Sequence, residues 1–181
     1  AYNEYSETVY TDYSNDAFVT LSEVIFSLQF TNCEKTGKYG PSQSQCNDVY
    51  SGTEYLDGQV SINNGIQEWT VPYTATYTIE ALGAAGSYGT GGSGGNGARM
   101  KGDIFLQANE LLKIVIGQQG TYGGSSEPGG GGGGSFIYTG DIGGVNGLLI
   151  AAAGGGGGGE EDAGSGQPGV SSEQGTMYDG S

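Results

Sequence analysis

The chain has 181 residues, 39 of them glycine, and its 5 Lys and Arg residues against 20 Asp and Glu residues give a formal net charge of −15. This charge argues against DNA, RNA or an anionic membrane surface as a partner, because each of these would repel the chain. Histidine is absent, which removes the commonest general base, and the longest apolar run, 148–153, is far too short to span a membrane.

The chain begins with an acidic segment rich in tyrosine. Residues 1–16 place Tyr2, Tyr5, Tyr10 and Tyr13 among Asn, Glu, Ser, Thr and Asp, without a helical or core periodicity. This lead has no core of its own. The tyrosines are candidates for contact with another subunit, because each offers apolar area together with a hydroxyl group that can stay hydrated.

A strand pattern follows this lead. Val24, Phe26, Leu28 and Phe30 alternate with other residues in a period of two, which is typical of a half-buried strand. Two placements are open. The strand can pair with the sheet edge of a neighbouring copy, or it can be the first strand of its own domain while residues 1–16 stay disordered.

The two cysteines lie close together in the sequence. Cys33 and Cys46 can close a loop of 14 residues, and a disulfide there would contribute about 3 kcal/mol in the chain-entropy model. A disulfide would indicate an oxidising compartment. The alternative is a pair of free, buried thiols. Two cysteines without histidine cannot form a four-ligand zinc site of the usual kind.

Further strands are predicted in the middle of the chain. The ranges 66–71 and 73–81 read as strands separated by Pro72, which cannot donate a ladder hydrogen bond and so marks a corner or an edge. The ranges 104–106 and 111–116 add two more, joined by a turn. Short strands separated by turns indicate an all-β sandwich.

Glycine dominates the rest of the chain. Two six-glycine tracts, 129–134 and 154–159, flank short apolar runs at 135–139 and 148–153, and a third glycine-rich region covers 83–97. Tracts anchored at both ends by strands can pack side by side as polyglycine II helices, because only glycine lets backbones approach so closely. The alternative is a flexible glycine linker.

Substitution of two glycines can distinguish packed helices from a flexible linker. Gly131 and Gly156 lie in the middle of the two tracts. If the tracts are packed helices, a Cβ atom at either position is expected to collide with a neighbouring backbone.

Several motifs, distributed in a consistent order over residues 30–159, resemble the glycine-rich extracellular region of the anaplastic lymphoma kinase and leukocyte tyrosine kinase receptors. The matching segments are 30–33, 40–47, 65–72, 76–79, 83–86, 115–120 and 149–159.

This resemblance implies a jelly-roll β-sandwich similar to the tumour-necrosis-factor fold, with glycine-rich loops projecting as packed polyglycine helices. It places the domain at 30–181, with glycine-rich segments at 83–97, 129–134 and 154–169, and leaves residues 1–29 as an N-terminal arm. The paired cysteines match a pair in the receptors. Ligand binding of the receptor type is not carried over, because the acidic residues 160–162 do not align with the receptor surface.

Three other features could indicate a binding site for calcium, a dinucleotide or a sugar. Glu160, Glu161 and Asp162 could offer oxygen ligands to calcium, although no calcium-loop motif is present and a solvated acidic loop is the plainer interpretation. The G-x-G-x-x-G match at 89–94 precedes a strand pattern instead of a helix, which argues against dinucleotide binding. Trp69 fits a core position better than a sugar-stacking platform.

We therefore expect no catalytic residues, no cofactor and no enzymatic activity, because no nucleophile lies in a recognisable motif. The expected function is an extracellular structural or adhesive protein that assembles with copies of itself into a filament or surface matrix. The alternative is a receptor-like or adhesin ectodomain that binds a basic protein or a glycan. In the first case the glycine region or the sheet edges contact other copies, and in the second an acidic face stays open.

Overall fold

The computed structural model describes residues 4–125 except 12–16, and residues 127–140, 147–160 and 164–170; for residues 4–25 it describes the backbone alone. In the described residues the regular secondary structure is one helix and antiparallel β-sheet, as expected for an all-β sandwich. The strands are β1 (Glu4–Thr11), β2 (Ala17–Ile25), β3 (Val60–Asn63), β4 (Ile66–Thr70), β5 (Ala75–Leu82), β6 (Arg99–Leu106), β7 (Leu111–Val115), β8 (Ser135–Thr139) and β9 (Leu148–Ala152), and the helix is α1 (Gln43–Tyr50).

The sandwich has two unequal layers. The larger sheet has five strands in the order β3-β4-β7-β8-β9, and the smaller one contains β5 and β6. Side chains from both layers meet in one core. Trp69, Leu112 and Ile114 of the larger sheet and Leu106 of the smaller one are buried, and half-buried Ile79 packs against the same core.

The strands predicted from alternation and from proline are present. Pro72 separates β4 from β5, and along β5 the residues Tyr77, Ile79 and Ala81 point inward between exposed neighbours. The predicted strand at 104–106 is the end of the longer strand β6, which begins at Arg99.

Two elements within 30–181 were not expected from the sequence. Strand β3 forms a hairpin with β4 around Asn64 and Gly65, whose φ angles of 50° and 79° suit a tight two-residue turn. Helix α1 begins after Ser42, whose hydroxyl group accepts a hydrogen bond from the backbone N–H of Gln45 while the Gln45 side chain bonds back to Ser42. This capping box marks the start of the helix.

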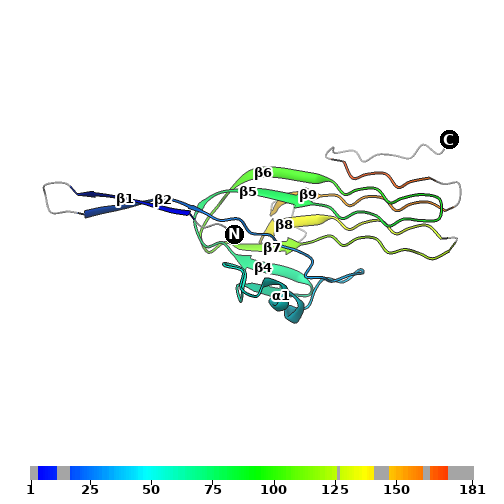
Figure 1. Ribbon diagram of the computed structural model, residues 1–181, viewed down its shortest axis with the longest axis horizontal. Helices are drawn as coiled ribbons and strands as arrows, with labels where there is room; N and C mark the ends of the chain where they lie inside the picture. Colours follow the sequence, from blue (N-terminus) through cyan, green and yellow to red (C-terminus); the bar gives the residue numbers. More distant parts are fainter. Residues whose placement is uncertain (1–3, 12–16, 126, 141–146, 161–163, 171–181) are drawn as a thin grey trace.

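The N-terminal segment folds back on itself. Strands β1 and β2 pair in an antiparallel hairpin, from Glu4 opposite Ile25 to Thr11 opposite Ala17. Figure 1 shows this hairpin extending away from the sandwich, at the end opposite the glycine-rich segments. The expectation that residues 1–16 lack a partner within the chain is therefore corrected for 4–11, because their backbone pairs with that of 17–25.

The predicted strand at 24–30 is divided by the structure. Its first part belongs to β2, which ends at Ile25. Beyond that point Phe26, Leu28 and Phe30 are half-buried between the more exposed Ser27 and Gln29 and pack against the core of their own domain. The predicted alternation is present, but 26–30 is not hydrogen-bonded into any of the described sheets.

Candidate functional site

The glycine-rich segments lie side by side as an extension of the sandwich, and Figure 1 shows them running away from the ends of the strands that they connect. We call them the glycine array. Its members are linked by backbone hydrogen bonds and cover 83–89, 92–98, 117–121, 129–134, 153–159 and 164–169.

The hydrogen bonds within the array repeat every three residues. In the tract 129–134, Gly129 N donates to Gly158 O and Gly132 N donates to Gly155 O, each at 2.8 Å. A β-strand would repeat its bonds to one neighbour every two residues. A spacing of three residues is that of an extended helix with three residues per turn.

The same tract also bonds to a second neighbour in a different direction. Gly130 N donates to Thr121 O and Gly133 N donates to Gln118 O, both at 2.9 Å, again with donors three residues apart. Carbonyl groups of the tract accept from a third segment, because Ala84 N donates to Gly133 O at 2.9 Å. Each backbone therefore finds partners on several sides, as a sheet strand cannot.

Close backbone contact explains the glycine content. A Cβ atom built on Gly132 would fall on the carbonyl oxygen of Ala84, and one built on Gly157 would fall on that of Gly129. Such overlaps require the backbone to move. A side chain at these positions is therefore incompatible with the packed array.

The two glycines selected from the sequence are not the most crowded ones. A Cβ atom on Gly131 would lie 3.5 Å from Gly155 O, an ordinary contact, so the predicted collision does not occur there. A Cβ atom on Gly156 would lie 3.1 Å from Gln167 N and 3.2 Å from Gln167 O, which is tight but not an overlap. Successive glycines of a tract face different neighbours, so the direction of each Cβ atom decides what a side chain would meet, and the middle of a tract has no special status.

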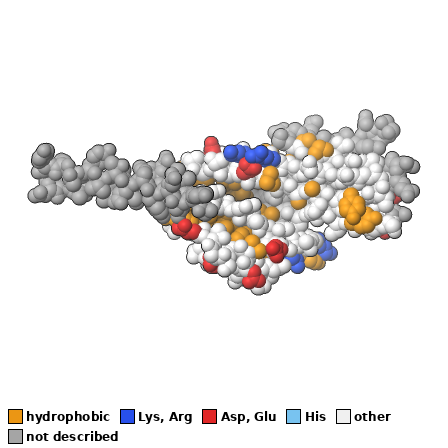
Figure 2. Space-filling view, viewed as in Figure 1, with side chains coloured by type: hydrophobic (Ala, Val, Ile, Leu, Met, Phe, Trp, Pro, Cys, Tyr) orange, Lys and Arg blue, Asp and Glu red, His pale blue; other side chains and the backbone are white. Residues whose placement is uncertain are grey.

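The far end of the array carries an aromatic pair. The rings of Tyr88 and Tyr122 stack with centroids 4.6 Å apart, and both residues are exposed. Figure 2 shows an apolar patch on the glycine-rich end of the molecule, surrounded mainly by backbone and other side chains drawn in white. Sequence analysis did not single out these tyrosines, because they are far apart in the sequence.

A groove runs along the smaller sheet. Its volume is about 560 Å³, and its walls are the extended segment 26–32 and strand β5. The floor is apolar and comes from the core side of the larger sheet, including Leu112, Ile114 and Ile137. Phe26 also lines the groove, and its ring lies 5.9 Å from the Tyr77 ring, centroid to centroid.

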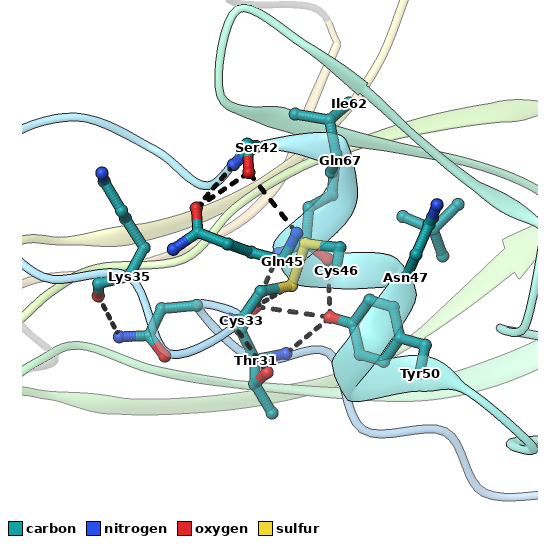
Figure 3. Close-up of a disulfide and its surroundings, with 12 residues drawn as sticks. Thr31, Cys33, Lys35, Ser42, Gln45, Cys46, Asn47, Tyr50, Ile62 and Gln67 are labelled. Carbon is teal, nitrogen blue, oxygen red and sulfur yellow. Dashed lines mark hydrogen bonds between the residues drawn. A yellow bond between two sulfur atoms is a disulfide. The ribbon is translucent and has the colours of Figure 1, made fainter.

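The predicted disulfide is present and connects the start of the domain to α1. Figure 3 shows the Cys33–Cys46 bridge beside a set of hydrogen bonds that end on Thr31. Tyr50 Oη donates to Gln67 Oε1 at 2.7 Å, and Gln67 Nε2 donates to Thr31 O at 2.6 Å. These bonds satisfy the polar side chain of Gln67, which is buried in the core.

Trp69 is a core residue. Its side chain is 4% exposed, and its indole N–H donates to Tyr55 O at 2.9 Å. The core interpretation is confirmed, and a ring buried to this extent cannot serve as a platform for sugar stacking.

The remaining candidate residues are placed only in part. Glu160 is exposed, whereas Glu161 and Asp162 lie outside the described residues. Within the described part of the chain, no three His, Cys, Asp or Glu side chains come together in a way that could hold a metal ion. Of the assembly candidates, Tyr2 and Tyr13 also lie outside the description; Tyr5, Tyr10 and Val24 lie in the β1–β2 hairpin.

Charged groups lie on the outer face of the smaller sheet. Arg99 Nε lies 2.7 Å from Glu80 Oε1, and this hydrogen-bonded contact lowers the pKa of the Glu80 carboxyl group, with a smaller contribution from Lys101. On the inner side of the sheet, burial raises the pKa of the Tyr77 hydroxyl group. Neither arrangement pairs an acid with a base in a cavity, as general acid–base catalysis would require.

Part of the chain is similar to a known receptor. Over 95 residues, 50% of this chain, the sequence is 33% identical to the leukocyte tyrosine kinase receptor of the mouse, Mus musculus, and the match covers 11% of that receptor. The chain therefore corresponds to a small part of its relative. No protein-family model matches the sequence. In the part of the chain that the structure describes, no helix combines the length and hydropathy required to cross a membrane.

Proposed function

We propose that this protein is a non-enzymatic extracellular structural or adhesive protein, and that copies of it assemble into a filament or surface matrix. In this proposal the sandwich is a jelly roll of the tumour-necrosis-factor type, and the glycine array is a bundle of polyglycine II helices that acts as a rigid rod or plate.

The observation that carries the proposal is the hydrogen-bond pattern of the glycine array. Donors spaced by three residues, Gly129 and Gly132 toward one neighbour and Gly130 and Gly133 toward another, are what a bundle of polyglycine II helices requires. A bundle held by its backbone has few side chains with which to build a catalytic site. Its rigidity suits a mechanical role.

The setting follows from the disulfide and the comparison. The Cys33–Cys46 bridge suits an oxidising environment, and the similarity to part of a receptor is compatible with an extracellular setting. On this support we propose that the protein acts outside the cell or on its surface.

A second candidate function is a receptor-like or adhesin ectodomain. The similarity to part of a receptor favours it, and a net charge of −15 suits a basic protein partner. The exposed pair Tyr88 and Tyr122 offers a surface on which a glycan could stack. In this case the protein stays monomeric and its acidic surface remains open.

Negative-stain electron microscopy and sedimentation of the purified chain separate the two functions. We expect regular assemblies at neutral pH and high protein concentration, and we expect deletion of residues 1–23 to abolish them while the sandwich stays folded. Uniform monomers of the full chain would count against the filament and favour the ectodomain. Assemblies that survive the deletion unchanged would show that the N-terminal arm does not connect the subunits.

A further inference from the structure

The groove beside β5 has the form of an unoccupied strand position. Six consecutive residues of β5, Tyr77 to Leu82, line it, as an edge of a strand does, whereas a face of a strand would contribute every second residue. The opposite wall, 26–32, has the in-and-out alternation of a strand over 26–30 but no ladder. Among the described residues, β5 pairs with β6 alone.

The register identifies which backbone groups face the groove. Gly83 N donates to Ala98 O at 2.9 Å in continuation of the β5–β6 ladder, so every second residue back along β5 bonds to β6. The residues between them, Thr76, Thr78 and Glu80, therefore direct their N–H and C=O groups to the other side. Leu82 fits this phase, because its carbonyl group accepts a hydrogen bond from Ser135 Oγ across the groove at 2.7 Å.

The β1–β2 hairpin offers a strand that suits this position. Strand β1 has 8 residues, as β5 does, and its sequence EYSETVYT is rich in tyrosine, threonine and valine, which favour strands. In the described residues β1 pairs only with β2. A hairpin of two strands alone is marginally stable in water, so β1 can leave its partner at little cost.

We propose that β1 of a second copy inserts into the groove beside β5 and pairs with its free edge. This inference rests on the proposed assembly and specifies the contact between neighbouring copies. The inserted strand would lie between β5 and 26–30, cover half-buried Ile137 of the apolar floor, and bond to the backbone groups of Thr76, Thr78 and Glu80. Each copy then donates one strand and receives one, so the contact repeats from copy to copy and produces a fibre.

Amide hydrogen exchange on the full chain tests this contact. In dilute monomer, the amides of Thr78 and Glu80 should exchange at the rate of unpaired groups. In assemblies they should slow by at least about tenfold, because they become hydrogen-bonded. Fast exchange at both residues in well-formed assemblies would overturn the inference and leave the filament standing. Slow exchange already in dilute monomer would also overturn it.

A synthetic peptide of residues 1–16 identifies the occupant without requiring a filament. Added in excess to dilute full chain, it should slow exchange at Thr78 and Glu80, and in assembling samples it should cap growing ends and shorten the fibres. A peptide of the same composition in scrambled order is the control. If the peptide protects these amides but the full chain never assembles, binding of β1 in the groove is supported and the proposed filament is rejected. If assemblies protect them but the peptide does not, another segment fills the groove.

Two substitutions at one position complete the test. Thr78→Pro removes an N–H group that faces the groove, whereas Thr78→Ala keeps this group. Both variants lose the hydrogen bond from the Thr78 hydroxyl group to Asp103, so that loss cancels in the comparison. We expect Thr78→Ala to assemble and Thr78→Pro to fail, with similar melting temperatures. Equal assembly of both would contradict the inference. If Thr78→Pro does not fold, the exchange and peptide measurements on the natural sequence still decide.

Discussion

Neighbouring glycines in one tract have different surroundings, although the residues are chemically identical. A Cβ atom on Gly132 would overlap the backbone of Ala84, whereas one on Gly131 would make an ordinary contact. We expect Gly132→Ala to destabilise the protein by about 1 to 3 kcal/mol, the usual cost of overpacking. Gly131→Ala should be neutral or should stabilise by up to about 1 kcal/mol, because alanine reduces the freedom of the unfolded chain. Urea unfolding of both variants measures the difference.

The comparison within one tract separates packing from composition. Both variants lose one glycine, at adjacent positions, and gain the same methyl group. Equal stability of the two proteins, whether lowered or unchanged, would show that the array is not packed as described.

The ion pair on the smaller sheet gives a prediction about titration. Arg99 holds the pKa of Glu80 below its ordinary value, chiefly through their hydrogen bond, and Lys101 adds a smaller charge effect. We expect Arg99→Gln to raise the pKa of Glu80 and Lys101→Gln to raise it less, in an NMR titration of the carboxyl carbon. A pKa unchanged by Arg99→Gln would contradict the ion pair.

The sign of the pH effect follows from the same shift. Because the pKa of Glu80 is lowered in the folded chain, its stabilising contribution is present above the unfolded pKa and is lost as the pH falls through the folded pKa. The side chains are solvent-exposed, so the effect on stability is small.

Among the elements, the disulfide loop joins the start of the domain to α1. Replacing both Cys33 and Cys46 by alanine should lower the free energy of unfolding by about 2 to 4 kcal/mol, because the unfolded chain gains the freedom of an open loop. The hydrogen bonds of Tyr50 and Thr31 should weaken with it, since the bridge holds both segments in place. Thermal unfolding and amide exchange check the two effects.

Alkylation provides the control for this prediction. In unfolded but unreduced protein, neither cysteine should take up an alkylating reagent, and both should do so after reduction. Uptake without a reductant would contradict the bridge.

The elements also show what the sequence could predict. Strand β5 was predictable because Tyr77, Ile79 and Ala81 alternate with polar residues, and Pro72 marks its beginning. Helix α1 was not, because it is short and buries only Cys46 and Tyr50, which gives almost no helical periodicity. Its one clear signal is the capping box, Ser42 with Gln45, and the corresponding signal for β3 is the turn Asn64–Gly65.

The candidate site was predictable as a region but not residue by residue. The tracts themselves indicate close backbone packing, and the array has it. Which glycines are crowded depends on the rotation of each segment about its axis, and a run of identical residues carries no information about that rotation. The backbone collision predicted for a Cβ atom at Gly131 is therefore absent there. It occurs instead at the neighbouring Gly132. Likewise, Tyr88 and Tyr122 meet only because two loops end together.

At the scale of the whole molecule, the net charge of −15 opposes association between copies. Salt shortens the range of this repulsion, from about 30 Å at 10 mM to about 8 Å at 150 mM. We therefore expect assembly to become faster as salt is raised over this range, followed by light scattering. Contacts with a basic partner would show the opposite dependence, so slower association at higher salt would favour the ectodomain over the filament.

The glycine array has a consequence for durability. Most digestive proteases choose the bond that they cut by fitting a side chain into a pocket, and the tracts 129–134 and 154–159 offer them none. Trypsin in particular finds no lysine or arginine anywhere after Lys113. Because the array backbone is already engaged with its neighbours, it is also not free to enter a protease cleft in extended form. A matrix built from such a chain would resist digestion within its two glycine tracts, without protection by glycans or cross-links.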